Sequence, residues 1–352
     1  MKISLVIVTH FSSGVLPACV SSFKREATAE GHDLQIVIVE HSETAAETAA
    51  VSALGVDLVL ERPNGGYAAG LNAGVACTDG EVLLLANPDI VLLEGCLRPL
   101  LEALNRGFSV VGPKLFWDSA AGVLLPPPED PSPRGELRRI LRRRWPWYWR
   151  WRLGAELENI HRHWSSSRPL EVGNLRGPLL VLSRADWRRF GEMNEDYFLY
   201  YEETEWLSRA RRVGARLAIA GRSALVHRWG HATSRRADAG AIEEASRRRF
   251  MERNYPRCVR RAVGCLQTRT VCPFSPEIIE DISSLPDVTA DLWLFSPFEH
   301  LAPAAGWVGD GGDPALAASL FTGGPWYAMA AERSPRGWKI KGVWTWRGDT
   351  RE

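Results

Sequence analysis

Short apolar runs near the start of the chain most constrain what it can fold into. Four runs rich in β-branched residues lie at positions 3–8, 34–39, 56–60 and 82–86. Longer segments separate them, and residues 16–30 have the apolar spacing of a helix. Near-continuous apolar strands joined by crossovers form parallel sheets that helices cover on both faces. The sequence therefore predicts an α/β fold.

Polar residues follow each of these four runs. They begin at Thr9, Glu40, Arg62 and Asn87. Because the carboxyl ends of parallel strands meet at one edge of a sheet, ligands of such sheets bind at that edge. The sequence thus predicts one binding crevice to which all four segments contribute.

The pattern changes twice along the remaining chain. Residues 129–169 interrupt it with a segment rich in arginine and tryptophan, and the alternating apolar runs after residue 264 are typical of short strands. We therefore expect one domain over residues 1–263 that carries a basic, Trp-rich insertion at about 129–169. Residues 264–352 are expected to form a small strand-rich C-terminal appendage.

Tryptophans recur in this appendage, at positions 293, 307, 326, 338, 344 and 346. Trp338, Ile340, Trp344 and Trp346 share one parity, which predicts that they occupy one face of a half-buried strand. The tryptophans fit three interpretations equally: a platform for carbohydrate, core packing, or contact with a partner.

The overall net charge of +1 conceals a strong asymmetry. Residues 1–128 carry a net charge of −7, residues 129–263 carry +12, and residues 264–352 carry −4. A basic middle indicates a surface for phosphates or lipid headgroups. Residues 138–152 combine arginine with tryptophan, which fits either contact with a membrane surface or a solvated basic loop with some tryptophans packed on the domain. The acidic N-terminal crevice argues against a nucleic-acid partner.

The six cysteines and the first residues of the chain indicate the cellular compartment that we expect. No Cys-x-x-Cys pair occurs, and no stretch approaches the roughly 20 apolar residues that span a bilayer. The first apolar run is too short for a signal peptide. We expect reduced thiols and a cytoplasmic location, with peripheral contact at the inner face of the membrane if the basic segment binds lipid.

A glycine-rich loop, Asn-Gly-Gly-Tyr-Ala-Ala-Gly-Leu-Asn-Ala-Gly, occupies residues 64–74 between a strand and a short helix. Glycines let backbone amides approach a ligand, and the amino terminus of a helix favours negative charge. The spacing matches neither the dinucleotide fingerprint nor a P-loop. The loop therefore predicts either an anion-binding turn or a tight turn with small residues for close packing.

Asp89 follows a fully apolar strand, and His227 ends another apolar run. A carboxylate in that place can bind a hard divalent cation through oxygen, to which a histidine can add a nitrogen ligand. The alternatives are a turn aspartate and a structural histidine.

Three glutamates lie close together at positions 202, 203 and 205. On a helix Glu205 meets Arg209, and Glu202 lies on that same side. Glu203 instead has apolar and aromatic neighbours, and burial among such groups raises the pKa of a carboxyl toward that of an effective general base. The alternative is three solvated helix glutamates.

These motifs, in their order and spacing over about residues 1–235, resemble the inverting GT-A-type glycosyltransferases of family 2. The resemblance is strongest to the bacterial rhamnosyltransferase-like branch, which builds surface polysaccharides. It implies a Rossmann-like mixed sheet flanked by helices. It also implies metal-dependent, inverting transfer of a hexose or deoxyhexose from a nucleoside-diphosphate sugar to a hydroxyl of a glycan or lipid-linked acceptor.

The resemblance also implies roles for single residues. It places the nucleotide sugar among Thr9, Glu40, Asn64, Gly66, Gly70, Asn72, Asn87 and Asp89. It assigns Mg²⁺ or Mn²⁺ to Asp89 and His227, because Asn87-Pro88-Asp89 takes the place of an Asp-x-Asp motif.

In the same way, the resemblance makes Glu203 the general base beside Glu202 and puts Gly177 and Pro178 beneath the acceptor. Glutamate replaces the family's usual aspartate at positions 40 and 203. The alternative is therefore a catalytically inactive protein that binds a sugar nucleotide or a glycan.

Overall fold

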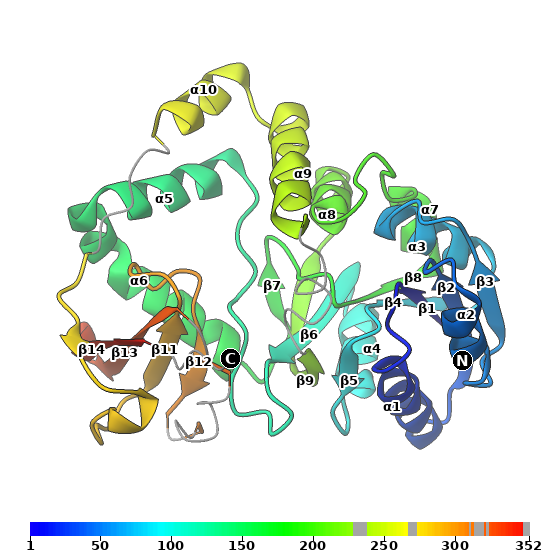
Figure 1. The fold of residues 1–352 in the computed structure, drawn as a ribbon, viewed down its shortest axis with the longest axis horizontal. Coiled ribbons are helices and arrows are strands. Elements are labelled where there is room, and N and C mark those ends of the chain that lie inside the picture. The colour runs from blue at the N-terminus through cyan, green and yellow to red at the C-terminus, as the bar shows by residue number, and fades with distance from the viewer. Residues whose placement is uncertain (228–237, 267–272, 310, 313–319, 322–323, 348–352) are drawn as a thin grey trace. The chain divides into compact units, whose positions relative to one another are not determined.

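The structure is a computed structural model that describes residues 1–227, 238–266, 273–309, 311–312, 320–321 and 324–347. It divides into two compact units (Figure 1). Unit 1 comprises Met1–Lys114 with Ser167–Tyr255, and unit 2 comprises Leu115–Ser166 with Pro256–Glu352. This division differs from the boundary expected at residue 263, since most of the inserted segment groups with the C-terminal sheet.

Unit 1 is built on a nine-stranded mixed sheet of order β3-β2-β1-β4-β8-β6-β9-β5, in which β7 also pairs with β9. Its strands are β1 (Lys2–Thr9), β2 (Asp33–Glu40), β3 (Leu58–Glu61), β4 (Val82–Ala86), β5 (Ile90–Leu92), β6 (Val110–Phe116), β7 (Leu170–Val172), β8 (Leu179–Ser183) and β9 (Leu217–His227). Strands β1 to β4 are parallel to one another, whereas β8 runs antiparallel to β4. The predicted α/β fold with a mixed sheet is confirmed.

The parallel register aligns the carboxyl ends of the first strands. Thr9 lies opposite Glu40, and Glu40 lies opposite Glu61. The strands β1, β2 and β4 are buried over most of their length, because apolar side chains on both of their faces pack under helices. The polar residues that follow them therefore share one edge, as predicted.

Helices flank this sheet. They are α1 (Leu16–Ala29), α2 (Ala45–Ser52), α3 (Tyr67–Ala76), α4 (Leu97–Asn105), α7 (Arg184–Phe190), α8 (Glu202–Arg212) and α9 (Ala239–Asn254). Helix α3 begins at Tyr67, inside the glycine-rich segment 64–74. A Cβ atom at Gly70 would lie 2.7 Å from both γ-carbons of Val8, so this glycine lets α3 approach β1 closely. At Gly70 the close-packing interpretation is confirmed.

Unit 2 contains a five-stranded sheet of order β10-β14-β13-β11-β12. Its elements are α5 (Pro133–Arg144), α6 (Pro146–Ser165), α10 (Arg257–Leu266), β10 (Glu277–Ile278), the 3₁₀ turn η1 (Ile282–Ser284), β11 (Leu292–Ser296), β12 (Ala305–Val308), β13 (Pro325–Ser334) and β14 (Gly337–Arg347). The strand-rich C-terminal region is thus confirmed. No helix of the described residues has both the length and the apolar composition needed to cross a bilayer.

The two faces of this second sheet bury different side chains. Leu292 and Leu294 of β11 face a cluster that includes residues of α6, such as Leu157. Trp293 and Phe295 belong to a second cluster, which we call the aromatic core. Its buried members are Val123, Ile282, Ala290, Trp293, Phe295, Ala305, Trp307, Phe321, Trp326, Ala328, Ala330, Trp344 and Trp346.

The prediction that Trp338 and Ile340 share a face with Trp344 and Trp346 is wrong. Trp338 packs on the α6 side, whereas Trp344 and Trp346 lie in the aromatic core. The cause is an irregularity in the pairing of β13 with β14, where the register shifts between Ala330 and Ala331. One extra residue in β14 reverses the alternation of faces, because side chains in a strand have a period of two.

The burial of the C-terminal tryptophans distinguishes among the three interpretations for five of the six residues. The tryptophans at 293, 307, 326, 344 and 346 are buried in the aromatic core, so core packing is confirmed for these five. Trp338 is half-buried and lines a groove of about 510 Å³ that α6 and β14 border.

Candidate functional site

The turn after β4 brings Asp89 next to His227. Its first residue, Asn87, donates its backbone N–H to the Pro178 carbonyl at 2.9 Å. Strand β5 then pairs with β9 so that Ile90 lies opposite His227. As a result, His227 Nε2 is 3.5 Å from Asp89 Oδ1, and the two side chains are only 12% and 7% exposed. The structure therefore brings together the two residues expected to hold a cation.

The Asp89–His227 pair fits part of a cation site. Asp89 Oδ1 is buried and has no hydrogen-bond partner among the described residues. A buried carboxylate oxygen beside an imidazole nitrogen suits a divalent cation. Within the described ranges, no group of three or more His, Cys, Asp or Glu side chains could hold a metal ion. A cation at this pair would therefore need further oxygen ligands from a bound ligand or from water.

Helix α8 begins at Glu202 after a sharp turn in the chain. Tyr200 and Tyr201 both have positive φ angles, 66° and 68°, a conformation that is costly for residues with a side chain. Glu205 forms the predicted ion pair with Arg209, at 3.4 Å. Glu202, which we expected on the side of Glu205, is only 4% exposed, and the Glu205 side chain is itself only 12% exposed.

Burial strongly affects Glu202 and Glu203. It is the main cause that raises the pKa of Glu203, while Arg176 acts in the opposite direction. The pKa of Glu202 is raised well above its ordinary value, first by burial and then by the charge of Glu203. The raised pKa predicted for Glu203 is thus confirmed. Two neighbouring buried carboxyl groups resist simultaneous ionisation, so the pair keeps a proton to a higher pH than one exposed carboxyl group would.

Gly177 and Pro178 connect these carboxyl groups to the turn that carries Asp89. A Cβ atom at Gly177 would lie 3.2 Å from both Cγ and Oε1 of Glu203. The missing side chain therefore leaves the space that Glu203 occupies. Pro178 accepts the hydrogen bond from Asn87 described above. The two residues expected on the acceptor side thus lie between Glu203 and the Asp89 turn.

Tyr67 is a residue of this site that the sequence interpretation did not single out. Its hydroxyl is buried and has no hydrogen-bond partner in the described chain. Burial is the largest cause that raises the pKa of Tyr67, and the charges of Glu202, Glu203 and Asp89 add to it. The charges of all three carboxylates therefore act on one phenol. We call Tyr67, Asp89, Glu202 and Glu203 the Tyr67 cluster.

The backbone before Tyr67 depends on glycine. Gly66 has a φ of 94°, and a Cβ atom there would overlap the backbone of Phe198. This approach lets the Tyr67 N–H donate to the Phe198 carbonyl at 2.9 Å. One sequence signal could have identified Tyr67, since it is the single aromatic residue in the glycine-rich segment 64–74.

Five buried oxygen atoms at this edge have no hydrogen-bond partner within the ranges that the structure describes. They are Thr9 Oγ1, Tyr67 OH, Asp89 Oδ1, Glu202 Oε2 and Glu203 Oε2. Most buried polar groups in proteins are paired, and leaving one unpaired costs about 1–3 kcal/mol. Such a concentration at one edge fits a site whose partners come from a polar ligand.

Other expected donor-binding side chains bond to the protein itself. The Asn72 amide donates to the carbonyl of Met193 and to Glu195, both at 2.9 Å. Glu40 accepts from the backbone of Ser42 at 2.7 Å. Asn64 similarly accepts from the backbone N–H of Gly66 at 3.1 Å. In this structure these three side chains hold loops in place.

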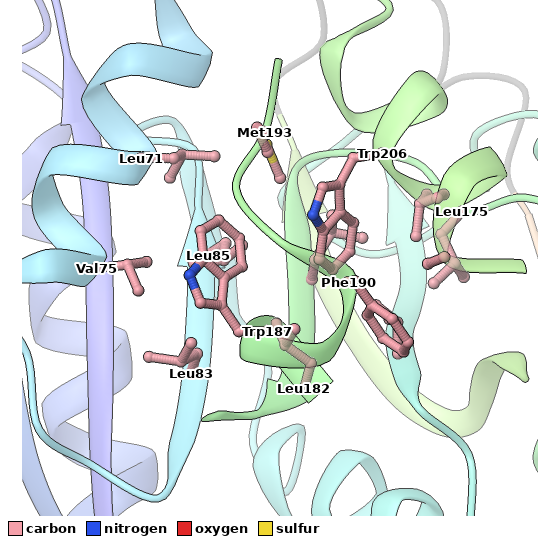
Figure 2. Close-up of a cluster of buried hydrophobic side chains, with 14 of the residues drawn as sticks. Leu71, Val75, Leu83, Leu85, Leu175, Leu182, Trp187, Phe190, Met193 and Trp206 are labelled. Carbon is pink, nitrogen blue, oxygen red and sulfur yellow. The ribbon is translucent and has the colours of Figure 1, made fainter. Parts of the chain in front are cut away.

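An apolar core packs against α8 through Trp206 (Figure 2). Trp206 of α8 packs against Trp187 and Phe190, with ring centroids 5.6 and 5.7 Å away. Its indole N–H donates to the Gly191 carbonyl at 2.7 Å. This packing restrains the helix turn that carries Glu202 and Glu203.

About half of the chain is similar to a protein of known role. A Haloferax volcanii protein, the low-salt glycan biosynthesis hexosyltransferase Agl10, is 25% identical over 183 residues, 51% of this chain and 53% of that protein. The chain thus spans about half the length of this relative.

Two solved structures are also similar. S. aureus TarS 1-349 in complex with UDP has a TM-score of 0.45 at 14% identity, over 64% of this chain and 60% of that one. A Pyrobaculum calidifontis mannosyltransferase in complex with GDP-Man and Mn²⁺ has a TM-score of 0.45 at 13% identity, over 77% and 66%. Residues 4–159, which include β1 to β4 and the turn with Asp89, match the family described as Glycosyl transferase family 2.

Proposed function

We propose that this protein is a glycosyltransferase that moves a sugar from a nucleoside-diphosphate sugar to a hydroxyl of a glycan or lipid-linked acceptor. The observation that carries the proposal is the set of five unpartnered buried oxygens, found among the described residues at the edge where β1 and β4 end. The family match over residues 4–159 and the similarity to a hexosyltransferase support glycosyl transfer. We further propose a hexose or deoxyhexose as the sugar, in surface polysaccharide or glycoconjugate synthesis, as in the rhamnosyltransferase-like branch.

Glu203 acts as the general base in this proposal. Its raised pKa suits the removal of a proton from an acceptor hydroxyl, because a base is most effective when its pKa lies near the working pH. The deprotonated oxygen attacks the anomeric carbon from the face opposite the departing diphosphate, so the configuration inverts. Glu202 places a second carboxyl group beside Glu203. Gly177 has no side chain, which leaves space next to Glu203 for the acceptor hydroxyl.

Asp89 and His227 would hold a divalent cation, Mg²⁺ or Mn²⁺. A cation supplies charge neutralisation for a diphosphate. Thr9 and Tyr67 contribute hydroxyl groups on the donor side, while the asparagines at 64 and 72 and Glu40 shape the loops around it.

The substitution Glu203→Gln tests the proposal most directly. Removal of a general base slows transfer by about 10²–10⁴-fold, whereas the amide keeps the size of the side chain. We therefore expect product formation to fall by that factor while nucleotide-sugar affinity, measured by calorimetry, stays within a few-fold. The matched control is Glu205→Gln, which alters a glutamate of the same helix turn that is paired with Arg209. Near-normal turnover of Glu203→Gln would remove Glu203 from the mechanism.

A protein that binds a sugar nucleotide or a glycan without transfer is the second candidate. Positions 40 and 203 hold glutamate, whereas the family that this sequence resembles usually has aspartate there. This difference favours the second candidate. Calorimetric titration with several nucleotide sugars, run alongside a product assay, distinguishes the two. Binding without product across a broad acceptor panel would favour the second candidate.

A further inference from the structure

Two tryptophans of α6 lie exposed on the surface of unit 2. Trp147 is 66% exposed and Trp151 is 71% exposed, and the other tryptophans in the described ranges are buried or half-buried. They are four residues apart, so they occupy the same face of the helix. The ring of Tyr148 connects them, with centroids 6.0 Å from Trp147 and 5.8 Å from Trp151.

The core of unit 2 does not need these two side chains. Other residues of the same helix, Trp149, Leu153 and Leu157, already pack against the sheet. Helix α6 therefore has one apolar side that is buried and another that is presented to solvent. Exposed aromatic groups beside polar residues mark an interaction surface.

The surroundings of these tryptophans are strongly basic. Residues 134–152 contain eight arginines and one acidic residue. That residue, Glu136, pairs with Arg139 at 2.6 Å. The exposed arginines of the segment are Arg134, Arg138, Arg143 and Arg150. The guanidinium of Arg152 lies 5.8 Å from the Trp151 ring. An occupant of this surface must therefore accept both aromatic rings and concentrated positive charge.

We propose that this surface, which we call the Arg–Trp surface (Arg134, Arg138, Arg143, Trp147, Arg150 and Trp151), binds membranes that contain anionic lipid. Tryptophan rings partition into the headgroup layer, and arginines are attracted to anionic headgroups. Helix α5 contributes the exposed Leu137 as well as three of the arginines. The inference goes beyond the proposed glycosyl transfer and does not rest on it.

The full-length protein and lipid vesicles provide the test. We expect it to sediment with vesicles that contain phosphatidylglycerol but not with pure phosphatidylcholine, and to be released by salt, which screens exposed charges. The double variant Arg134→Gln/Arg138→Gln should bind anionic vesicles about 25-fold more weakly, since each arginine near the surface contributes about a factor of five. The double variant Trp147→Ala/Trp151→Ala should lose at least as much. Alanine preserves the helix.

Matched controls separate this surface from a general effect of charge or of apolar exposure. Arg98→Gln/Arg222→Gln removes the same charge from exposed arginines of unit 1. Ile278→Ser removes the 84% exposed side chain of β10. Both controls should sediment like the unaltered protein. The proposal is overturned if the unaltered protein does not bind anionic vesicles. It is equally overturned if the control variants weaken binding as much as the variants of the Arg–Trp surface do. It is also overturned if the tryptophan variant abolishes self-association instead, because the surface would then join copies of the chain.

Discussion

The Tyr67 cluster and the aromatic core are both buried, but they are built in opposite ways. In the aromatic core, Trp293 stacks on Trp344 with ring centroids 5.8 Å apart, and Phe295 stacks on Phe321 at 4.8 Å. In the Tyr67 cluster, four buried oxygens have no hydrogen-bond partner among the residues described. Burial of the first group is favourable by itself, whereas burial of the second is not.

This difference means that the aromatic core stabilises the fold, whereas the Tyr67 cluster destabilises it. Aromatic pairs in contact contribute about 0.5–1.5 kcal/mol beyond the area they bury. Buried polar atoms without partners cost about 1–3 kcal/mol each. A cluster of buried oxygens that lowers stability at this edge of the sheet is consistent with the ligand site that we propose. The aromatic core, in contrast, is explained by stability alone.

The largest expected effect on stability is in the aromatic core. Trp293→Ala removes a ring that contacts several others, and truncation of a buried aromatic residue costs about 3–5 kcal/mol. We expect the free energy of unfolding, measured in urea, to fall by that amount. The matched control is Trp147→Ala, which truncates a tryptophan that is 66% exposed and should change the free energy of unfolding by less than about 0.5 kcal/mol. Equal effects of the two substitutions would show that the core does not stabilise unit 2.

The contrast also explains how much the sequence could predict. The strand at 82–86 and the shared edge of the parallel strands follow from apolar runs, and these patterns depend only on local order along the chain. The Glu205–Arg209 pair was predictable for the same reason, because a helix places residues four apart side by side.

Features that depend on tertiary contacts were not predictable in this way. No periodicity of the sequence reveals the left-handed turn at Tyr200 and Tyr201 or the burial of Glu202 directly after it. The grouping of Asp89 and the glutamates around Tyr67 joins segments more than a hundred residues apart. The opposite faces of Trp338 and Trp344 result from a register shift between β13 and β14, which depends on the pairing of two strands.

The second prediction concerns the pH dependence of stability in the Tyr67 cluster. The folded pKa of Glu202 is raised well above its ordinary value of 4.5. The folded state therefore holds a proton that the unfolded state has lost, and its stability falls as the pH rises above about 4.5 toward the folded pKa. Each pH unit in that window costs about 1.4 kcal/mol. Glu202→Gln removes this penalty, so its advantage in unfolding free energy should grow as the pH rises from about 4.5 toward the folded pKa.

Urea unfolding of both proteins across that range measures the difference. Glu205→Gln is the control, because Glu205 is a glutamate of the same helix whose carboxylate is paired with Arg209 in the folded protein. We expect no gain in stability from it at any pH. A constant difference between Glu202→Gln and the unaltered protein would mean that Glu202 ionises as easily in the folded chain as in the unfolded one. The Tyr67 cluster would then not differ from the aromatic core in the electrostatic cost of burying its carboxyl groups.

The smallest expected effect is the most specific, because it concerns one hydroxyl group. Tyr67→Phe removes an oxygen that is buried without a partner in the described chain and leaves the ring in place. The free energy of unfolding should rise by about 1 kcal/mol, since the unpaired group no longer has to be desolvated. Tyr148→Phe, in a half-buried tyrosine of α6, should leave it nearly unchanged. If Tyr67→Phe lowers stability instead, the hydroxyl has a partner in the folded protein, and the Tyr67 cluster is a structural network like any other rather than a site prepared for a ligand.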